Sequence, residues 1–213
     1  MKSTEIIVHG WKSSGSDRGT LDLVYDCFLT IFLCCWSSLH MNVPADHESK
    51  TTCIIRQVKW MIICILTPEI LAYKAICEFG IARACREEMA KIPQLHGQGW
   101  ALIHGFLLIM GGISLKTADG GSFRPSADHF LELVRSGEVE VSKLPTEEIE
   151  DKNKTSWIVK TLALAQILWF AAGELARAIQ HLPVTTLELF TIAIIFCSII
   201  TYASWWHKPR DIQ

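Results

Sequence analysis

The sequence feature that most constrains the fold is an 18-residue run without a formal charge, residues 189–206, which follows Glu188 directly. A run of this length is long enough for a helix that crosses a membrane. A carboxylate at the edge of the hydrocarbon is costly, so we expect Glu188 to face protein or water. Hydrophobic residues make up 50% of the chain and gather in further blocks. The sequence therefore predicts a multi-pass membrane protein that has the lipid bilayer as its partner.

Five blocks are predicted to form the spans of an all-α transmembrane bundle. They cover residues 21–39, 60–77, 92–115, 157–181 and 183–206. Pro68 and Glu69 interrupt the second span, and the helix of the third is expected to begin near Trp100. Pro183 suits the first turn of the fifth helix. Tryptophans at the predicted span ends indicate an interfacial aromatic belt; they are Trp60, Trp100, Trp157, Trp205 and Trp206.

The predicted spans divide the chain into segments. These are a polar N-terminal segment (1–20), spans one to three (21–115), an extramembrane cap (116–156), spans four and five (157–206) and a tail (207–213). The first segment lacks the apolar core of a secretory signal, so we expect the first span to act as an uncleaved anchor. In the cap, Ser126 and Gly137 are predicted to bound a short amphipathic helix over 128–136. Residues 139–141 alternate like a strand, and 145–148 resemble another helix start.

The orientation follows from the distribution of Lys and Arg. With five spans, one side of the membrane carries eight of these residues and the other carries 12. The richer side, which holds the cap and the C-terminal tail, is predicted to be cytoplasmic. Asn153 begins an N-glycosylation sequon in the cap, and this orientation predicts that it stays unmodified.

Composition and motifs argue against several classes of function. The net charge of −2, without basic clusters interleaved with aromatics, gives no support for nucleic-acid binding. The eight cysteines contain no C-x-x-C pair and lie mostly in apolar runs, so neither a disulfide framework nor a zinc site is expected. The sequence also lacks a phosphate-binding glycine loop and a G-x-S-x-G nucleophile motif. We therefore expect no cofactor and no metal.

Four titratable residues within the apolar blocks are the candidates for chemistry: Asp26, Glu69, His104 and Glu188. One reading is that these polar groups, which lie within stripes along the helices, make helix-to-helix contacts. In that case we expect Glu188 to pair with a cation such as Arg177. The other reading is a polar cavity, in which a buried carboxylate or imidazole acts as an acid or a base.

A set of single residues and short motifs occurs in order over residues 10–213: Trp100, His104, Asp211, 18–22 (RGTLD), 39–44 (LHMNVP), 67–69 (TPE), 110–112 (MGG), 148–152 (EIEDK), 182–189 (LPVTTLEL) and 206–209 (WHKP). In this set the chain resembles a family of fungal integral membrane proteins. The chain departs from the family pattern near Glu174, where uncharged residues are usual.

The resemblance implies a role beside polyketide or polyketide–peptide pathways of secondary metabolism. There, an auxiliary membrane protein would bind or position a hydrophobic intermediate or a membrane-bound pathway enzyme. One alternative is a membrane-embedded cyclase or isomerase that uses the four candidate residues. A second alternative is a small transporter, against which the lack of an internal repeat argues.

Overall fold

The computed structural model describes residues 19–45, 48–92, 100–139, 141, 156–181 and 183–209, with side chains of the α7 helix described from residue 161. The predicted helix start at 145–148 and the sequon at Asn153 lie outside the described residues, as does Glu140 in the alternating stretch.

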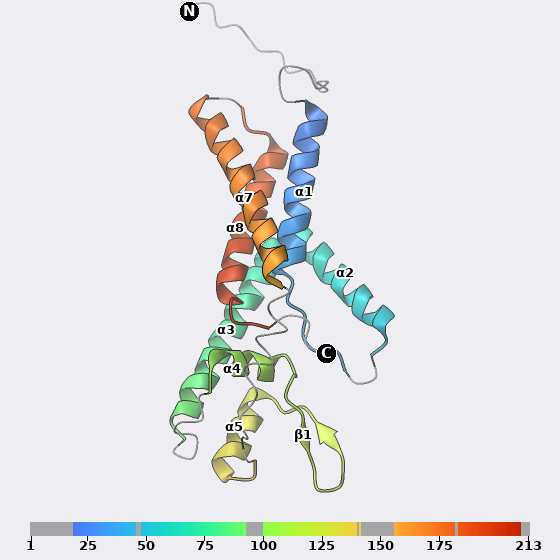
Figure 1. Ribbon diagram of the computed structural model, residues 1–213, viewed down its shortest axis with the longest axis vertical. Helices are drawn as coiled ribbons and strands as arrows, with labels where there is room; N and C mark the ends of the chain where they lie inside the picture. The colour runs from blue at the N-terminus through green and yellow to red at the C-terminus, as the bar shows by residue number, and fades with distance from the viewer. Residues whose placement is uncertain are drawn as a thin grey trace, which may run out of the picture.

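The described chain is mostly helical. Its elements, in order, are α1 (Thr20–Ser38), α2 (Lys50–Leu66), α3 (Pro68–Ala90), α4 (Leu102–Ile109), β1 (Leu115–Lys116), β2 (Ser122–Phe123), α5 (Ala127–Ser136), α7 (Ser156–Ile179) and α8 (Thr186–Ser204). In Figure 1, α1, α7 and α8 form an upper bundle. Helix α3 leads down from it to α4, α5 and the β1–β2 hairpin, and α2 projects to one side.

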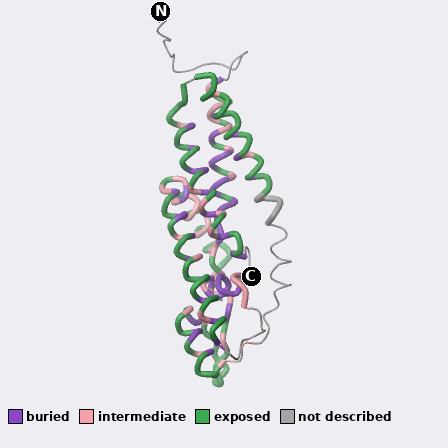
Figure 2. The backbone as a smooth tube through the Cα atoms, turned by 90° about the vertical axis from the view of Figure 1, so that its left-hand side faces the viewer, coloured by how far each residue is buried: buried purple, intermediate pink, exposed green. Residues whose placement is uncertain are grey.

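Three described helices are long and apolar enough to cross a membrane: α1, α7 over Thr161–Ile179, and α8. Much of their apolar surface faces outward, as the green stretches of the upper helices in Figure 2 show; Trp169 on α7, for example, is 74% exposed. Outward-facing apolar side chains suit helices that contact lipid. Counting the bent pair α2–α3 as one span raises the number to four, so the expected total of five stays a prediction.

The region predicted as the second span differs from a continuous helix. It is divided between α2 and α3, which meet at Thr67 with a bend of 111°. Pro68 causes the break, because proline has no N–H to donate and is favoured in the first turn of a new helix. Helix α2 begins at Lys50, ten positions before the predicted start, where the Ser49 hydroxyl accepts a hydrogen bond from the Thr51 N–H. That cap supplies the start signal that hydropathy alone misses.

The third predicted span also differs from a membrane-length helix. Residues 93–99 lie outside the described part, and α4, which follows, has only eight residues. Eight residues measure about 12 Å along a helix axis, far less than the ~30 Å of a hydrocarbon core. The helix ends at Met110–Gly111, where Gly111 has a φ of 75°. This left-handed conformation is one that glycine adopts readily, so the helix stops there.

Two smaller expectations for the span ends are wrong. Pro183 precedes α8 and lies outside its first turn, because Thr185 is the N-cap and the helix begins at Thr186. Trp205 does not belong to an exposed belt, since it is only 2% exposed and packs in the main core. Trp100 likewise packs against the rings of His104 and Phe130. Trp206 is exposed, as the belt prediction requires.

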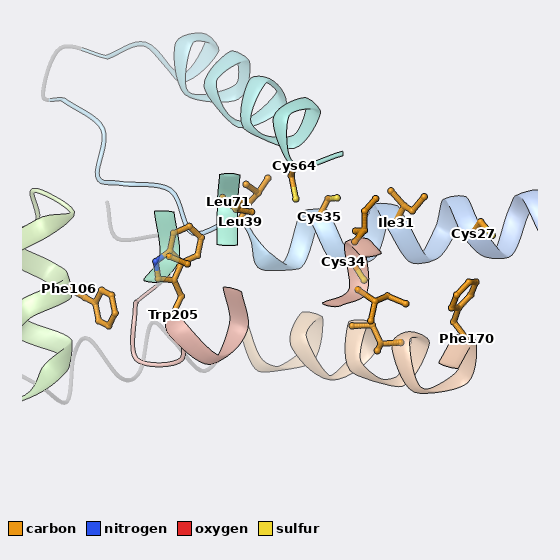
Figure 3. Close-up of a cluster of buried hydrophobic side chains, with 14 of the residues drawn as sticks. Cys27, Ile31, Cys34, Cys35, Leu39, Cys64, Leu71, Phe106, Phe170 and Trp205 are labelled. Carbon is orange, nitrogen blue, oxygen red and sulfur yellow. The ribbon is translucent and has the colours of Figure 1, made fainter. Parts of the chain in front are cut away.

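The main core joins α1, α3, α4, α7 and α8 with the end of α2. Small cysteine and alanine side chains fill it where the helices approach closely, with larger residues such as Ile31 and Phe170 between them (Figure 3). Small residues at contacts are typical of helices that pack within a membrane. A second cluster lies where α3, α4 and α5 meet, around Met89, Leu108 and Phe130.

The short helix predicted in the cap is confirmed as α5. The Ser126 hydroxyl accepts a hydrogen bond from the His129 N–H at its start, and Gly137, with a φ of 77°, ends it. Its buried face, which includes Phe130 and Val134, packs in the second cluster. Because both caps are local signals, the sequence was sufficient to place this helix.

Candidate functional site

Glu188, the residue that heads the long apolar run, is fully buried and acts first as a helix cap. Its Oε2 accepts hydrogen bonds from the Thr185 N–H at 2.7 Å and the Thr185 hydroxyl at 2.9 Å. The Thr185 hydroxyl in turn accepts from the Glu188 N–H, which completes a capping box. Its Oε1 lies 3.7 Å from Arg177 Nε. The predicted pairing with Arg177 is therefore confirmed.

His104 is buried at the start of α4. Its Nδ1 accepts a hydrogen bond from the Ala101 N–H at 2.9 Å, which places the ring proton of the neutral form on Nε2. The ring lies 5.3 Å from that of Trp100. Burial lowers the pKa of His104 below its ordinary value. The side chain is thus a neutral group that holds the first turn of α4.

Asp26 and Glu69 occupy two further environments. Asp26 borders a cavity of about 240 Å³ between α1 and α7, which Gln166, Phe170 and Glu174 also line. Glu69 is exposed in the first turn of α3. A negative charge there interacts favourably with the unpaired N–H groups at the helix start. The cavity beside Asp26 is lined by none of the other three candidates. The four candidates therefore do not form a single site.

A cluster of charged side chains that the sequence did not indicate lies where α1 and α8 end beside α3. We call it the lysine–glutamate cluster; it comprises Lys74, Glu78, Lys208, Asn42 and Trp205. Lys208 Nζ lies 2.7 Å from Glu78 Oε2 and donates to Asn42 Oδ1 at 3.3 Å. Lys74 forms an ion pair with the other oxygen of Glu78. Glu78 thus holds two ammonium groups.

The fold assembles this cluster from three segments. Lys74 and Glu78 are four positions apart on α3, which places them on one face of the helix. Lys208 reaches them because the chain turns after Trp205, the C-cap of α8, and the Lys208 N–H donates to the Trp205 carbonyl at 3.0 Å. Asn42 follows α1. The site therefore exists only when α1, α3 and α8 are packed together.

Burial makes the ion pair between Lys208 and Glu78 energetically demanding. Lys208 is 0% exposed, and burial lowers its pKa to about 7. Three contacts favour the protonated amine: the carboxylate of Glu78, the oxygen of Asn42 and the Trp205 ring, whose centroid lies 4.2 Å from Nζ. A buried charge with such partners is stable, but removing one partner leaves the other uncompensated.

A cavity of about 180 Å³ adjoins the cluster, and we call it the tryptophan pocket. Its lining residues are Leu39, His40, Met41, Asn42, Arg56, Trp60, Leu71, Lys74 and Trp205. Among the described residues, the lining combines two indole rings with two cations and contains no carboxylate. A volume of this size accommodates one ring or a short chain, since pockets for drug-sized ligands measure about 300–1,000 Å³.

Two buried hydrogen-bond donors belong to residues of this pocket. Within the described part of the chain, no acceptor pairs with Trp205 Nε1 or with Arg56 Nε. Arg56 does bind Glu48 through Nη1, at 2.8 and 2.7 Å, so its remaining donor is separate from that ion pair. Buried donors are usually satisfied, which makes these two notable in residues that line the same pocket as Lys74. The pocket is therefore suited to an oxygen-bearing or anionic group.

Neither the lysine–glutamate cluster nor the Glu188 cap was predicted from the sequence, although each has one local signal in the sequence that could have indicated it. Lys74 and Glu78 have i,i+4 spacing beside an apolar block, and Thr185 and Glu188 have the spacing of a capping box. Lys208 offered no such signal, because a lysine in a polar tail is ordinarily solvated.

The fold defines a class of protein. It is an α-helical protein that has membrane-length apolar helices and a buried charge cluster at the ends of these helices. Comparison with protein families shows that the chain belongs to a family of unknown function, DUF8562, whose sequence profile matches residues 1–213. The search of curated proteins and the search of solved structures each found no match.

Proposed function

We propose that this chain is a multi-pass membrane protein that binds an amphipathic molecule, with the acidic or carbonyl end of that molecule in the tryptophan pocket. The observation that carries the proposal is the chemistry of the pocket wall. Its described lining includes Lys74 and no acidic side chain, and two other lining residues, Arg56 and Trp205, each have a buried donor without a described acceptor. An anionic group is the ligand that such a wall recognises best.

The apolar part of the ligand would remain outside the pocket, against lipid and the bundle. The pocket itself holds only about 180 Å³, and the neighbouring helices expose apolar side chains such as Ile62 and Tyr73. Binding without conversion suits the dispersed placement of Asp26, Glu69, His104 and Glu188, since acid–base catalysis requires its groups around one reacting centre.

In the setting that the family resemblance implies, the ligand would be a hydrophobic intermediate of a fungal secondary-metabolite pathway. The protein would hold it at the membrane surface for a partner enzyme, as an auxiliary protein without chemistry of its own. Polyketide-type intermediates combine an apolar chain with acidic or carbonyl oxygens, which is the combination that the pocket favours.

Fluorescence energy transfer from tryptophan to a dansyl group tests this proposal. The purified full chain in a neutral detergent is titrated with 11-(dansylamino)undecanoic acid and, separately, with its uncharged methyl ester. We expect the acid to bind more tightly than the ester. Lys74→Gln should weaken binding of the acid by tenfold or more, because it removes one of the two cations that line the pocket.

The matched control is Lys59→Gln, which removes an exposed cation from α2, outside the pocket lining. Its affinity for the acid should equal that of the natural chain. Equal binding of acid and ester, or an unchanged affinity in Lys74→Gln with an intact melting transition, would contradict the proposal.

A further inference from the structure

Helices α1 and α8 run parallel, and this constrains everything between them. The residue numbers of contacting pairs increase together along α1 and α8 and the chain that follows each. The pairs are Cys34 with Ser198, Ser37 with Tyr202, His40 with Trp205 and Asn42 with Lys208. Helix α7 precedes α8 across a short turn and runs in the opposite direction, as Figure 1 shows. If these three helices cross a membrane, the chain from α2 to α5 must begin and end on the same side.

Helix α3 runs in the same direction as α8. The apolar part of α3 is too short to cross a membrane. Near its start, Glu69 interacts electrostatically with Cys197 in the second half of α8, whereas Glu78 contacts Lys208 beyond the end of α8. Its exposed face is apolar from Ile70 to Ile81 and becomes charged at Arg83. Twelve residues extend about 18 Å, compared with a hydrocarbon thickness of ~30 Å.

The junction between α2 and α3 packs against α1 on one side. Cys64, near the end of α2, contacts Cys35 and Ser38 near the end of α1. Thr67, at the 111° bend, donates hydrogen bonds from both its N–H and its hydroxyl to the Ile63 carbonyl, at 2.8 and 3.0 Å. A helix break is tolerated at membrane depth when its polar groups are satisfied internally and it is packed against protein.

The outer face of α2 has the pattern of a helix that lies in a membrane interface. At 100° per residue, one arc of the helix carries exposed apolar side chains; these are Ile54, Ile55, Val58, Ile62 and Leu66. Lys50 and Lys59, both exposed, lie at the two opposite edges of this arc. Lysines in such positions extend their ammonium groups toward headgroup phosphates while the apolar arc contacts acyl chains.

We propose that α2 and α3 form a re-entrant hairpin, which enters the membrane and leaves it on the same face, with the apolar arc of α2 against lipid acyl chains and Lys50 and Lys59 at the phospholipid headgroups. This inference rests on the proposed membrane location. It yields three spans, with both ends of the hairpin and the end of α8 on one side of the membrane. The hairpin, the other segments between α1 and α7, the start of α7 and the chain after α8 together hold 16 of the 20 Lys and Arg residues, so that side is the cytoplasmic side.

Cysteine labelling in sealed microsomes, whose cytoplasmic face is outward, tests the hairpin. The full chain, with its partly exposed natural cysteines replaced by alanine, receives one new cysteine in each variant: Ser49→Cys before α2, Lys91→Cys after α3, or His181→Cys between α7 and α8. A membrane-impermeant maleimide should label the first two in intact vesicles. The third should react only after detergent opens the vesicles.

Any other labelling pattern of the three variants would lead to a different conclusion about the hairpin or the membrane location. Labelling of positions 49 and 91 from opposite sides would overturn the hairpin and make α2–α3 a true span. Equal labelling of all three in intact vesicles would show that no membrane separates them, which would defeat the membrane location itself. Labelling of position 181 alone would invert the orientation and keep the hairpin, because the first two would still share a side.

A nitroxide attached at Ile62→Cys tests the lipid contact of α2 directly. On the apolar arc it should collide freely with dissolved oxygen and be shielded from a water-soluble nickel chelate. A nitroxide at Lys91→Cys, outside the hairpin, should show the reverse. Equal nickel accessibility at both positions would show that lipid does not cover the arc.

Discussion

Glu78 and Lys208 are separated by 130 positions in sequence, yet their side chains meet in a buried ion pair. Lys74, Asn42 and the Trp205 ring complete the surroundings of this pair. Glu188, in contrast, owes its burial to a local role. It caps its own helix and faces Arg177, so its function at this scale is structural.

Replacing Glu78 with glutamine should make stability depend more steeply on pH. In the natural chain, burial already lowers the pKa of folded Lys208 to about 7, compared with ~10.4 when unfolded, and losing the carboxylate lowers the folded pKa further. Between these values the unfolded chain binds more protons, so the free energy of unfolding rises with pH. Glu78→Gln should therefore lose about 3–5 kcal/mol near pH 7 and recover part of that loss at pH 9.

Melting temperatures of the detergent-solubilised variants at pH 7, 8 and 9 provide the measurement. The double variant Glu78→Gln with Lys208→Met is the control, because it removes the buried amine and should abolish the rise with pH. A melting temperature of Glu78→Gln that stays flat from pH 7 to 9 would contradict the assignment of Lys208 as a buried charge.

At the scale of elements, the contact between α3 and α4 depends on one glycine. A Cβ added at Gly105 would lie 2.7 Å from the Ala82 carbonyl oxygen, closer than packed atoms allow. Because a backbone oxygen cannot move aside cheaply, Gly105→Ala must displace α4 from α3. That displacement would disturb Phe106, which is fully buried in the main core.

We expect Gly105→Ala to destabilise the protein by about 1–3 kcal/mol, the usual cost of overpacking. Gly80→Ala is the matched control. It lies on α3 and its added Cβ would meet no atom within 4 Å, so it should be neutral or stabilise by about 0.5–1 kcal/mol through helix propensity. Thermal unfolding of both variants checks the difference, and equal melting temperatures would argue against the close α3–α4 approach.

At the scale of the whole molecule, the three apolar helices and the outward-facing side chains of the upper bundle predict integral insertion. The described surface exposes large apolar residues along α1, α7 and α8, such as Phe28, Leu168 and Phe196. Large exposed apolar patches on soluble monomers are rare, so this surface is consistent with contact with lipid.

The protein should accordingly remain in the membrane pellet after washing with alkaline carbonate and enter the supernatant with detergent. A co-expressed peripheral membrane protein, released by carbonate, serves as the control. Release of this chain by carbonate alone would remove the basis for both the proposed function and the re-entrant hairpin, whereas retention leaves those two to their separate tests.

Local signals in the sequence were sufficient for several elements. The long apolar runs predicted α1, α7 and α8, and the caps at Ser126 and Gly137 placed α5. These features depend on residues a few positions apart, where hydropathy, capping and helix propensity act directly. Glu188 and Arg177 were also paired correctly, because only the short turn between α7 and α8 separates them.

The angle between α2 and α3 and the lysine–glutamate cluster were decided by the tertiary structure alone. Pro68 indicates a break, but the 111° angle follows from how α2 and α3 pack against α1 and α8. The lysine–glutamate cluster joins residues from the chain after α1, from α3 and from the tail, and the parallel alignment of α1 with α8 brings them together. The free energy of a buried charge is set by whichever partners the fold places within hydrogen-bonding distance, and no local pattern in the sequence specifies them.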